Sequence, residues 1–147
     1  MSVRLSGPAA RSGLPRVDRA LLRRRARRIL TALACEAAEL SITLVDDAAM
    51  AALNQRHRGR PRPTDVLAFS LLEGAHAERR GPLLGDVVIG LETAARQARA
   101  RRRTLDDEVA RLLVHGALHL IGYDHVRRAD ARVMRAQERR VWQALRA

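Results

Sequence analysis

The chain has 147 residues, of which 47% are apolar, so it can bury a hydrophobic core without the help of disulfides. Its net charge is +12 and all 28 basic residues are arginines, which makes a polyanion such as a nucleic acid the leading class of partner. A single cysteine excludes an intramolecular disulfide, and no apolar run is long enough for a transmembrane helix or an ordinary signal peptide. We therefore expect one soluble, cytoplasmic domain over residues 1–147, without membrane association.

The N-terminal part is expected to hold two strands and the start of a second helix. Residues 2–5 suit a short edge strand, and apolar residues at helical spacing predict a helix over about 18–35, with Cys35 buried and inert. The arginines that fill the rest of this helix suit a solvated face and an RNA-facing stripe equally well. Alternation over residues 40–44 predicts a half-buried strand, and the aspartates at 46–47 suit the N-cap of the next helix.

A segment rich in proline and glycine, residues 58–65, follows that helix. Two prolines and a glycine so close together exclude regular structure and predict a stiff loop. Arg58, Arg60 and Arg62 lie on this segment, and a guanidinium can hold a phosphate and offset charge that develops on it. Spacing alone does not rank these three arginines, and a solvated basic turn is the plain alternative.

Aliphatic runs predict two more strands, and helical periodicity follows them to the end of the chain. These elements are expected over residues 66–69, 84–89, 91–102, 104–121 and 127–146, with a polar loop at about 73–82. Thr104 and Asp107 have the spacing of a capping box at the start of the fourth of these elements. The whole pattern predicts an α/β fold, with a small mixed β-sheet of three to four strands packed against about five helices.

The helix over 104–121 is expected to carry a metal site. His115, His119 and His125 are three of the five histidines in the chain. The first two are four residues apart and leave the same face of a helix, and Gly122 permits the chain to turn so that His125 returns toward them. This spacing, H-x3-H-x5-H, matches the zinc helix of metalloproteases. Three neutral imidazoles would leave the fourth position of a zinc ion to water.

Gly116 distinguishes this motif from that of a metalloprotease. Those proteases carry a glutamate general base directly after the first histidine, where this chain has Gly116. A peptidase is therefore the weakest candidate function. Zinc held by three imidazoles lowers the pKa of a bound water to about 7 and can polarise a phosphoryl oxygen, so the predicted site also suits hydrolysis of a phosphodiester.

Three segments of the chain resemble the YbeY family of bacterial endoribonucleases. They are residues 115–125, which meet H-G-x-L-H-L-x-G-Y-D-H in full, residues 53–69 and residues 84–89, and Met134 and Glu138 also fit the family's terminal helix. The resemblance implies a zinc-dependent endoribonuclease specific for single strands, active in ribosomal RNA 3′-end maturation and ribosome quality control. It further implies one Zn²⁺ per chain, and single-stranded RNA, ribosomal RNA and the small ribosomal subunit as partners.

The resemblance also assigns roles to individual residues. Carried over by position, the family's zinc ligands fall on His115, His119 and His125. The arginine that the family needs for RNA cleavage falls on Arg58, which selects it among the three arginines of the loop.

Three residues depart from the family pattern, without removing a zinc ligand. His57 stands where tyrosine is usual, Ala68 where serine is usual, and Ser70 where proline is usual. The hydroxyl missing at Ala68 can lower activity. The alternative function is a non-catalytic ribosome-binding maturation factor with a structural zinc. A fourth protein ligand, either His57 or Asp124, would favour that alternative, whereas an open metal position facing an arginine would favour catalysis.

Overall fold

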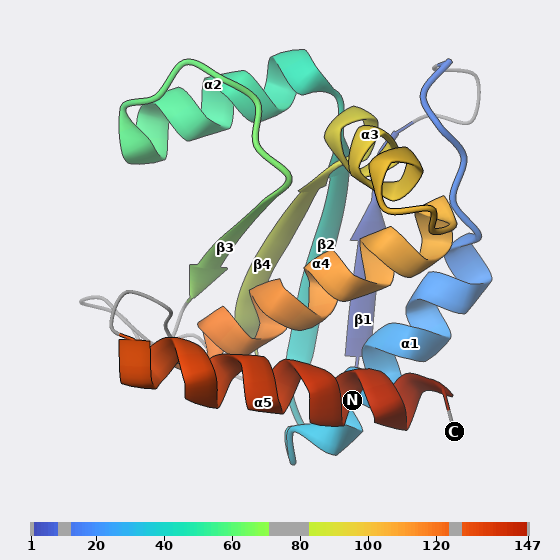
Figure 1. The fold of residues 1–147 in the computed structure, drawn as a ribbon, viewed down its shortest axis with the longest axis vertical. Helices are drawn as coiled ribbons and strands as arrows, with labels where there is room; N and C mark the ends of the chain where they lie inside the picture. Colours follow the sequence, from blue (N-terminus) through green and yellow to red (C-terminus); the bar gives the residue numbers. More distant parts are fainter. Residues whose placement is uncertain (1, 9–12, 71–82, 124–127, 147) are drawn as a thin grey trace.

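The structure, a computed structural model, describes residues 2–8, 13–70, 83–123 and 128–146 (Figure 1). Its strands are β1 (Ser2–Ser6), β2 (Glu39–Val45), β3 (Val66–Ser70) and β4 (Leu83–Gly90), which form one sheet in the order β1-β2-β4-β3. The pairings β1–β2 and β2–β4 are parallel, and β3 pairs antiparallel with β4 at one edge of the sheet. The expected small mixed sheet is confirmed.

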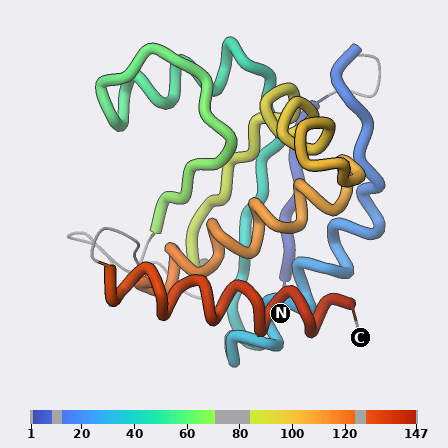
Figure 2. Tube along the Cα trace, in the orientation of Figure 1, coloured from blue at the N-terminus to red at the C-terminus, as the bar shows by residue number. Residues whose placement is uncertain are grey.

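The helices of the described chain are α1 (Arg19–Ala32), α2 (Asp47–Arg58), α3 (Leu91–Ala100), α4 (Leu105–Leu120) and α5 (Arg128–Arg146). Helix α4 crosses one face of the sheet, and α5 lies alongside α4 and α1 (Figures 1 and 2). The five helices confirm the expected α/β fold. None of them is long and apolar enough, over its described residues, to cross a membrane.

The end of α1 differs from the prediction. The helix ends at Ala32, so Cys35 follows the helix and is half-buried where a fully buried thiol was expected. Burial raises the pKa of the Cys35 thiol, and the neighbouring Glu36 raises it further. The thiol is therefore poorly nucleophilic, as predicted, although it is not sealed in the core. The polar loop predicted at about 73–82 lies outside the described residues.

The sheet carries a hydrophobic cluster on each face, because successive side chains of a strand point to opposite sides. Val66, Val87 and Ile89 join the larger cluster, to which α1, α4 and α5 also contribute. Leu67 and Val88, at the intervening positions, pack with Met50 of α2 in a smaller cluster. Helices α4 and α2 are thus held on opposite faces of the same two strands.

The start of α4 follows from the residues around Thr104. The Thr104 hydroxyl accepts a hydrogen bond from the backbone N–H of Asp107 at 3.1 Å, as predicted for a helix cap. The Asp107 carboxylate pairs with Arg25 of α1 at 2.9 Å, so the side chain that would complete a capping box instead ties α4 to α1.

Helix α4 also lies very close to the sheet at one point. A Cβ atom added to Gly116 would be 2.8 Å from Cγ1 of Val87 and 3.1 Å from its Cγ2. Gly116 therefore faces β4, and a glutamate at this position would have no space on that side of the helix. A peptidase-type base at this position is therefore excluded by packing, whereas the side chain of the adjacent His115 is half-buried and lines a pocket.

Candidate active site

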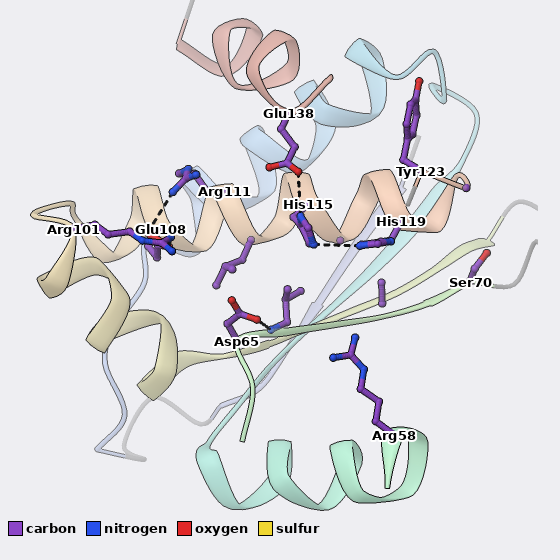
Figure 3. Close-up of a pocket in the computed structure, with 15 residues that line it drawn as sticks. Arg58, Asp65, Ser70, Arg101, Glu108, Arg111, His115, His119, Tyr123 and Glu138 are labelled. Atoms are coloured by element: carbon purple, nitrogen blue, oxygen red, sulfur yellow. Dashed lines mark hydrogen bonds and ion pairs between the residues drawn. The ribbon is translucent and has the colours of Figure 1, made fainter. Parts of the chain in front are cut away.

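Two of the three predicted metal ligands come together at the C-terminal end of α4. The Nε2 atoms of His115 and His119 lie 3.2 Å apart, with the imidazole planes at 75° (Figure 3). Two imidazole nitrogens that bind one tetrahedral zinc ion at about 2.05 Å lie about 3.3 Å from each other. The described pair therefore fits two adjacent ligand positions of a single ion.

Helix α5 fixes the orientation of one of these rings. Nδ1 of His115 lies 3.2 Å from Oε1 of Glu138, and both side chains are half-buried. When Nδ1 carries the proton and donates it to this carboxylate, the lone pair of His115 is on Nε2, which points toward His119. A carboxylate behind a metal-binding imidazole has this arrangement in many zinc sites. The sequence assigned no role to Glu138 beyond its fit to the family.

The third predicted ligand, His125, lies outside the described residues, as does Asp124. Among the residues that the structure does describe, no group of three or more His, Cys, Asp or Glu side chains is arranged to hold a metal ion. The predicted site of His115, His119 and His125 therefore stays a prediction. His57 does not join the pair, because its ring packs against Phe69 at a centroid distance of 4.5 Å.

Arg58 lines the same pocket as the histidine pair, although it is not on a loop. It is the last residue of α2, which Gly59 caps with a φ of 67° in the left-handed region. The prediction of an irregular segment from residue 58 was wrong at its first residue, because a glycine that ends a helix was interpreted as part of a loop. Figure 3 shows the Arg58 guanidinium directed toward the histidines from the opposite side of the sheet. Arg60 and Arg62 do not line this pocket.

A buried glutamate, which the sequence pattern did not single out as part of a site, stands at the other end of the pocket. Glu108 is fully buried and has three arginines around it, at 2.9 Å for Arg101, 3.6 Å for Arg103 and 3.9 Å for Arg111. These partners offset the cost of burying a carboxylate. Glu108 and Arg111 are seven and four residues before His115, so the helical period that relates the histidines could have identified them as well.

The described side chains of the pocket balance in charge. The pocket has a volume of about 610 Å³ and is lined by three arginines and three carboxylates, namely Arg58, Arg101, Arg111, Asp65, Glu108 and Glu138. Asp65 is held in place, since it accepts hydrogen bonds from the Val66 N–H at 2.7 Å and from Gln97 at 3.2 Å. A divalent cation on the histidines would therefore provide the excess positive charge that an RNA phosphate needs.

Two of the three departures from the family line the pocket. Ala68 and Ser70 are on β3, and they face α4. The Ser70 hydroxyl donates a hydrogen bond to the Leu120 carbonyl at 3.1 Å, which links the edge strand to the end of the metal helix. Ala68 contributes no polar atom, so the described pocket wall is apolar at that position.

Comparison with known proteins identifies the family. The family model described as Endoribonuclease YbeY matches residues 13–146. A protein named Endoribonuclease YbeY from an Anaeromyxobacter species is 51% identical over 140 residues, which are 94% of this chain and 69% of that protein. A protein of the same name from Anaeromyxobacter dehalogenans is 52% identical over 117 residues, which are 80% of this chain and 59% of that protein.

A solved structure has the same fold. The solution structure of TM1509 from Thermotoga maritima matches with a TM-score of 0.64 at 22% identity, over 97% of this chain and 88% of that one. The match to the Anaeromyxobacter dehalogenans protein leaves part of that longer relative without a counterpart, since it spans 59% of its length. The family model nevertheless extends over nearly all of this sequence. The chain belongs to the YbeY family.

Proposed function

We propose that this chain is a zinc-dependent endoribonuclease that cuts single-stranded RNA. The observation that carries the proposal is one pocket that holds a histidine pair spaced for a single metal ion together with the guanidinium of Arg58. The relatives named Endoribonuclease YbeY support RNA as the substrate. The resemblance supports a role in ribosomal RNA 3′-end maturation and ribosome quality control, at the small ribosomal subunit in the cytoplasm.

The roles of the side chains follow from their places in the pocket. His115 and His119 would hold the ion through Nε2, with His125 as the third ligand, and Glu138 would keep the His115 ring in position. When bound, zinc supplies a Lewis acid for water and for a phosphoryl oxygen. As water attacks phosphorus and the bond to the leaving oxygen breaks, negative charge grows on the phosphoryl oxygens, and Arg58 is placed to offset it.

The test combines metal analysis with RNA cleavage. Protein purified without added metal should contain close to one zinc per chain, and it should cut a short, labelled single-stranded RNA. His119→Ala should lose both zinc and cleavage, because it removes one ligand nitrogen. Glu138→Gln keeps the size of the side chain and removes its charge, so it should lower zinc affinity about tenfold or more in competition with a chromophoric chelator.

Two outcomes would contradict parts of this proposal. Unchanged zinc content in a His119→Ala, His125→Ala double variant would refute the metal assignment. Zinc in the wild type, with no more cleavage than His119→Ala gives, would favour the ribosome-binding maturation factor with a structural zinc.

A further inference from the structure

A second hollow, here called the α4–α5 groove, lies between the two C-terminal helices. It has a volume of about 470 Å³, and its polar lining is dominated by Arg103, Arg111, Arg135, Arg139 and Arg146 beside Trp142. Glu138 is the one carboxylate among the described residues that line it. The groove thus carries an excess of positive charge, which the described side chains of the pocket around the histidine pair, here called the histidine pocket, do not have.

The groove and the pocket adjoin each other. Arg111 of α4 and Glu138 of α5 line both of them. Glu138 also contacts His115, so the groove begins directly beside the histidine pair. From Glu138 to Arg146 the helix advances about 12 Å along its axis. That length accommodates about three phosphates at the axial spacing of roughly 3.4 Å in a stacked strand.

The arginines of α5 are arranged as a stripe. Arg128, Arg132, Arg135, Arg139 and Arg146 fall within about 60° of the helix circumference at 100° per residue. All five are exposed, and three of them line the groove. Within the described parts of the chain, those three make no hydrogen bond or ion pair. Their guanidiniums are therefore available to phosphate oxygens without loss of an internal partner.

Trp142 offers an aromatic surface in the same groove. It is half-buried against the hydrophobic core, and it is the single tryptophan of the sequence. The guanidinium of Arg25 lies 5.9 Å from the centroid of its rings, and the Asp107 carboxylate holds that guanidinium at 2.9 Å. These contacts order the indole, and an ordered ring loses little entropy when a nucleobase stacks on its accessible part.

We propose that the α4–α5 groove binds the segment of single-stranded RNA that adjoins the scissile phosphate, with phosphates on the α5 arginines and one base against Trp142. This inference rests on the proposed endoribonuclease function. The charge excess, the arginine stripe and the continuity with the histidine pocket all favour a flexible polyanion. The isolated aromatic ring favours contact with a single base, without a stacking platform for several bases.

Trp142 also makes the proposal testable, because tryptophan fluorescence reports on this groove alone. A six-nucleotide single-stranded RNA is titrated into the full chain in the cold, and gel analysis of the same samples verifies that the RNA is intact. Fluorescence should fall saturably as the groove fills. Arg135→Gln/Arg139→Gln should raise Kd about tenfold, and it should reduce the slope of log K against log salt by about 1.4, or about 0.7 for each phosphate that the variant no longer neutralises.

The matched control removes the same charge from another helix. Arg24→Gln/Arg27→Gln changes two exposed arginines of α1 that line neither the pocket nor the groove. It should affect Kd and the salt slope far less than the α5 pair does. Trp142→Leu, followed by anisotropy of a labelled RNA, should weaken binding about tenfold because no base can stack on the leucine.

Three results would overturn the inference. The first is an equal effect of the two double variants on Kd and on the salt slope. The second is an unchanged RNA affinity of the Trp142→Leu variant. The third is stronger quenching of Trp142 fluorescence by a glutamate-rich peptide than by RNA. The experiments can also refute RNA binding by the groove and the proposed nuclease function independently of each other. If the wild type shows zinc-dependent cleavage but Arg135→Gln/Arg139→Gln leaves the RNA affinity unchanged, only the role of the groove is refuted. Saturable quenching that depends on those arginines, in a wild type without metal-dependent cleavage, supports the groove and overturns the nuclease.

Discussion

Arg58 owes its position to the residue after it. Gly59 ends α2 in the left-handed conformation, and its N–H bonds to the Gln55 carbonyl at 3.0 Å. Asn54 holds the following loop by donating to the Arg62 carbonyl at 2.8 Å. The guanidinium therefore projects from a closed helix end, which is a more rigid support for a charge-stabilising group than a loop would be.

Replacement of Arg58 tests whether this placement serves catalysis. Arg58→Ala should slow cleavage at saturating RNA about 10²-fold or more, because it removes a group that stabilises charge in the transition state. Zinc content and the thermal midpoint should stay unchanged, and RNA binding should weaken modestly, since many other arginines share the phosphate contacts. Arg60→Ala is the control, because Arg60 is two residues away and outside the pocket. Wild-type cleavage by Arg58→Ala would refute the catalytic role.

The sequence predicted these side chains unequally, for physical reasons. The spacing of four residues predicted a common helix face for His115 and His119, and their Nε2 atoms lie 3.2 Å apart. Glu108 was not identified as part of the site, although it is on the same helix and is fully buried. Two of its three arginine partners, Arg101 and Arg103, come from the turn between α3 and α4, and helical periodicity carries no information about partners outside the helix.

At the scale of elements, α4 is the part on which the site depends most. Its N-terminal half is tied to α1 through Asp107, and its C-terminal half both packs directly on β4 at Gly116 and presents the histidines. A shift of this helix away from the sheet would move both imidazoles together. The separation between α4 and β4 is thus a structural determinant of the site.

The Gly116–Val87 contact provides a test of that separation. Gly116→Ala should lower the free energy of unfolding by about 1–3 kcal/mol, because the new methyl group overlaps the Val87 side chain. For a chain of this size, each 1 kcal/mol lowers Tm by about 2–4 °C. Val87→Ala creates space at the same point, so the double variant should be more stable than the sum of the single effects predicts. Additive changes in Tm would show that the two residues do not clash.

Most elements were predicted from local patterns, and their ends were predicted less well. The alternation over residues 40–44 matches β2 because every second residue of that strand is buried. Helix α1 ends three residues before its predicted end, since the chain turns at Leu33 and Ala34, and Ala34 has a φ of 56°. An alanine in the left-handed region carries no sequence signal of the kind that a glycine provides.

At the scale of the whole molecule, the net charge of +12 should dominate encounters with RNA. Affinity for single-stranded RNA should fall steeply with salt, by about 0.7 in log K per decade of salt for each phosphate contacted. Base preference should be small, since the chain has only three aromatic residues, Phe69, Tyr123 and Trp142. A Kd that barely changes between low and physiological salt, measured by anisotropy on several sequences, would contradict this expectation.

The strand order was beyond the reach of local patterns. β3 and β4 are consecutive in the chain and pair antiparallel. β2 pairs in parallel with β4, although α2 and β3 lie between them in the sequence. Other strand orders would satisfy the same alternation of apolar residues, so the pattern predicted a mixed sheet but could not predict the order of its strands. Which face each helix covers depends on that order, as does the placement of Arg58 and the histidine pair at one pocket.

The two faces of the sheet also differ in the size of the hydrophobic cluster that holds the helices on them. The histidines stand on the face with the large cluster, whereas Arg58 is carried by a helix anchored through the three buried side chains of Met50, Leu67 and Val88. Local unfolding is easiest where the fewest apolar groups are buried. Brief detachment of α2 would withdraw Arg58 while the histidine pair stays in place. Amide hydrogens of α2 should therefore exchange through smaller openings than those of α4, and the weaker face should set the fraction of time for which the site is fully assembled.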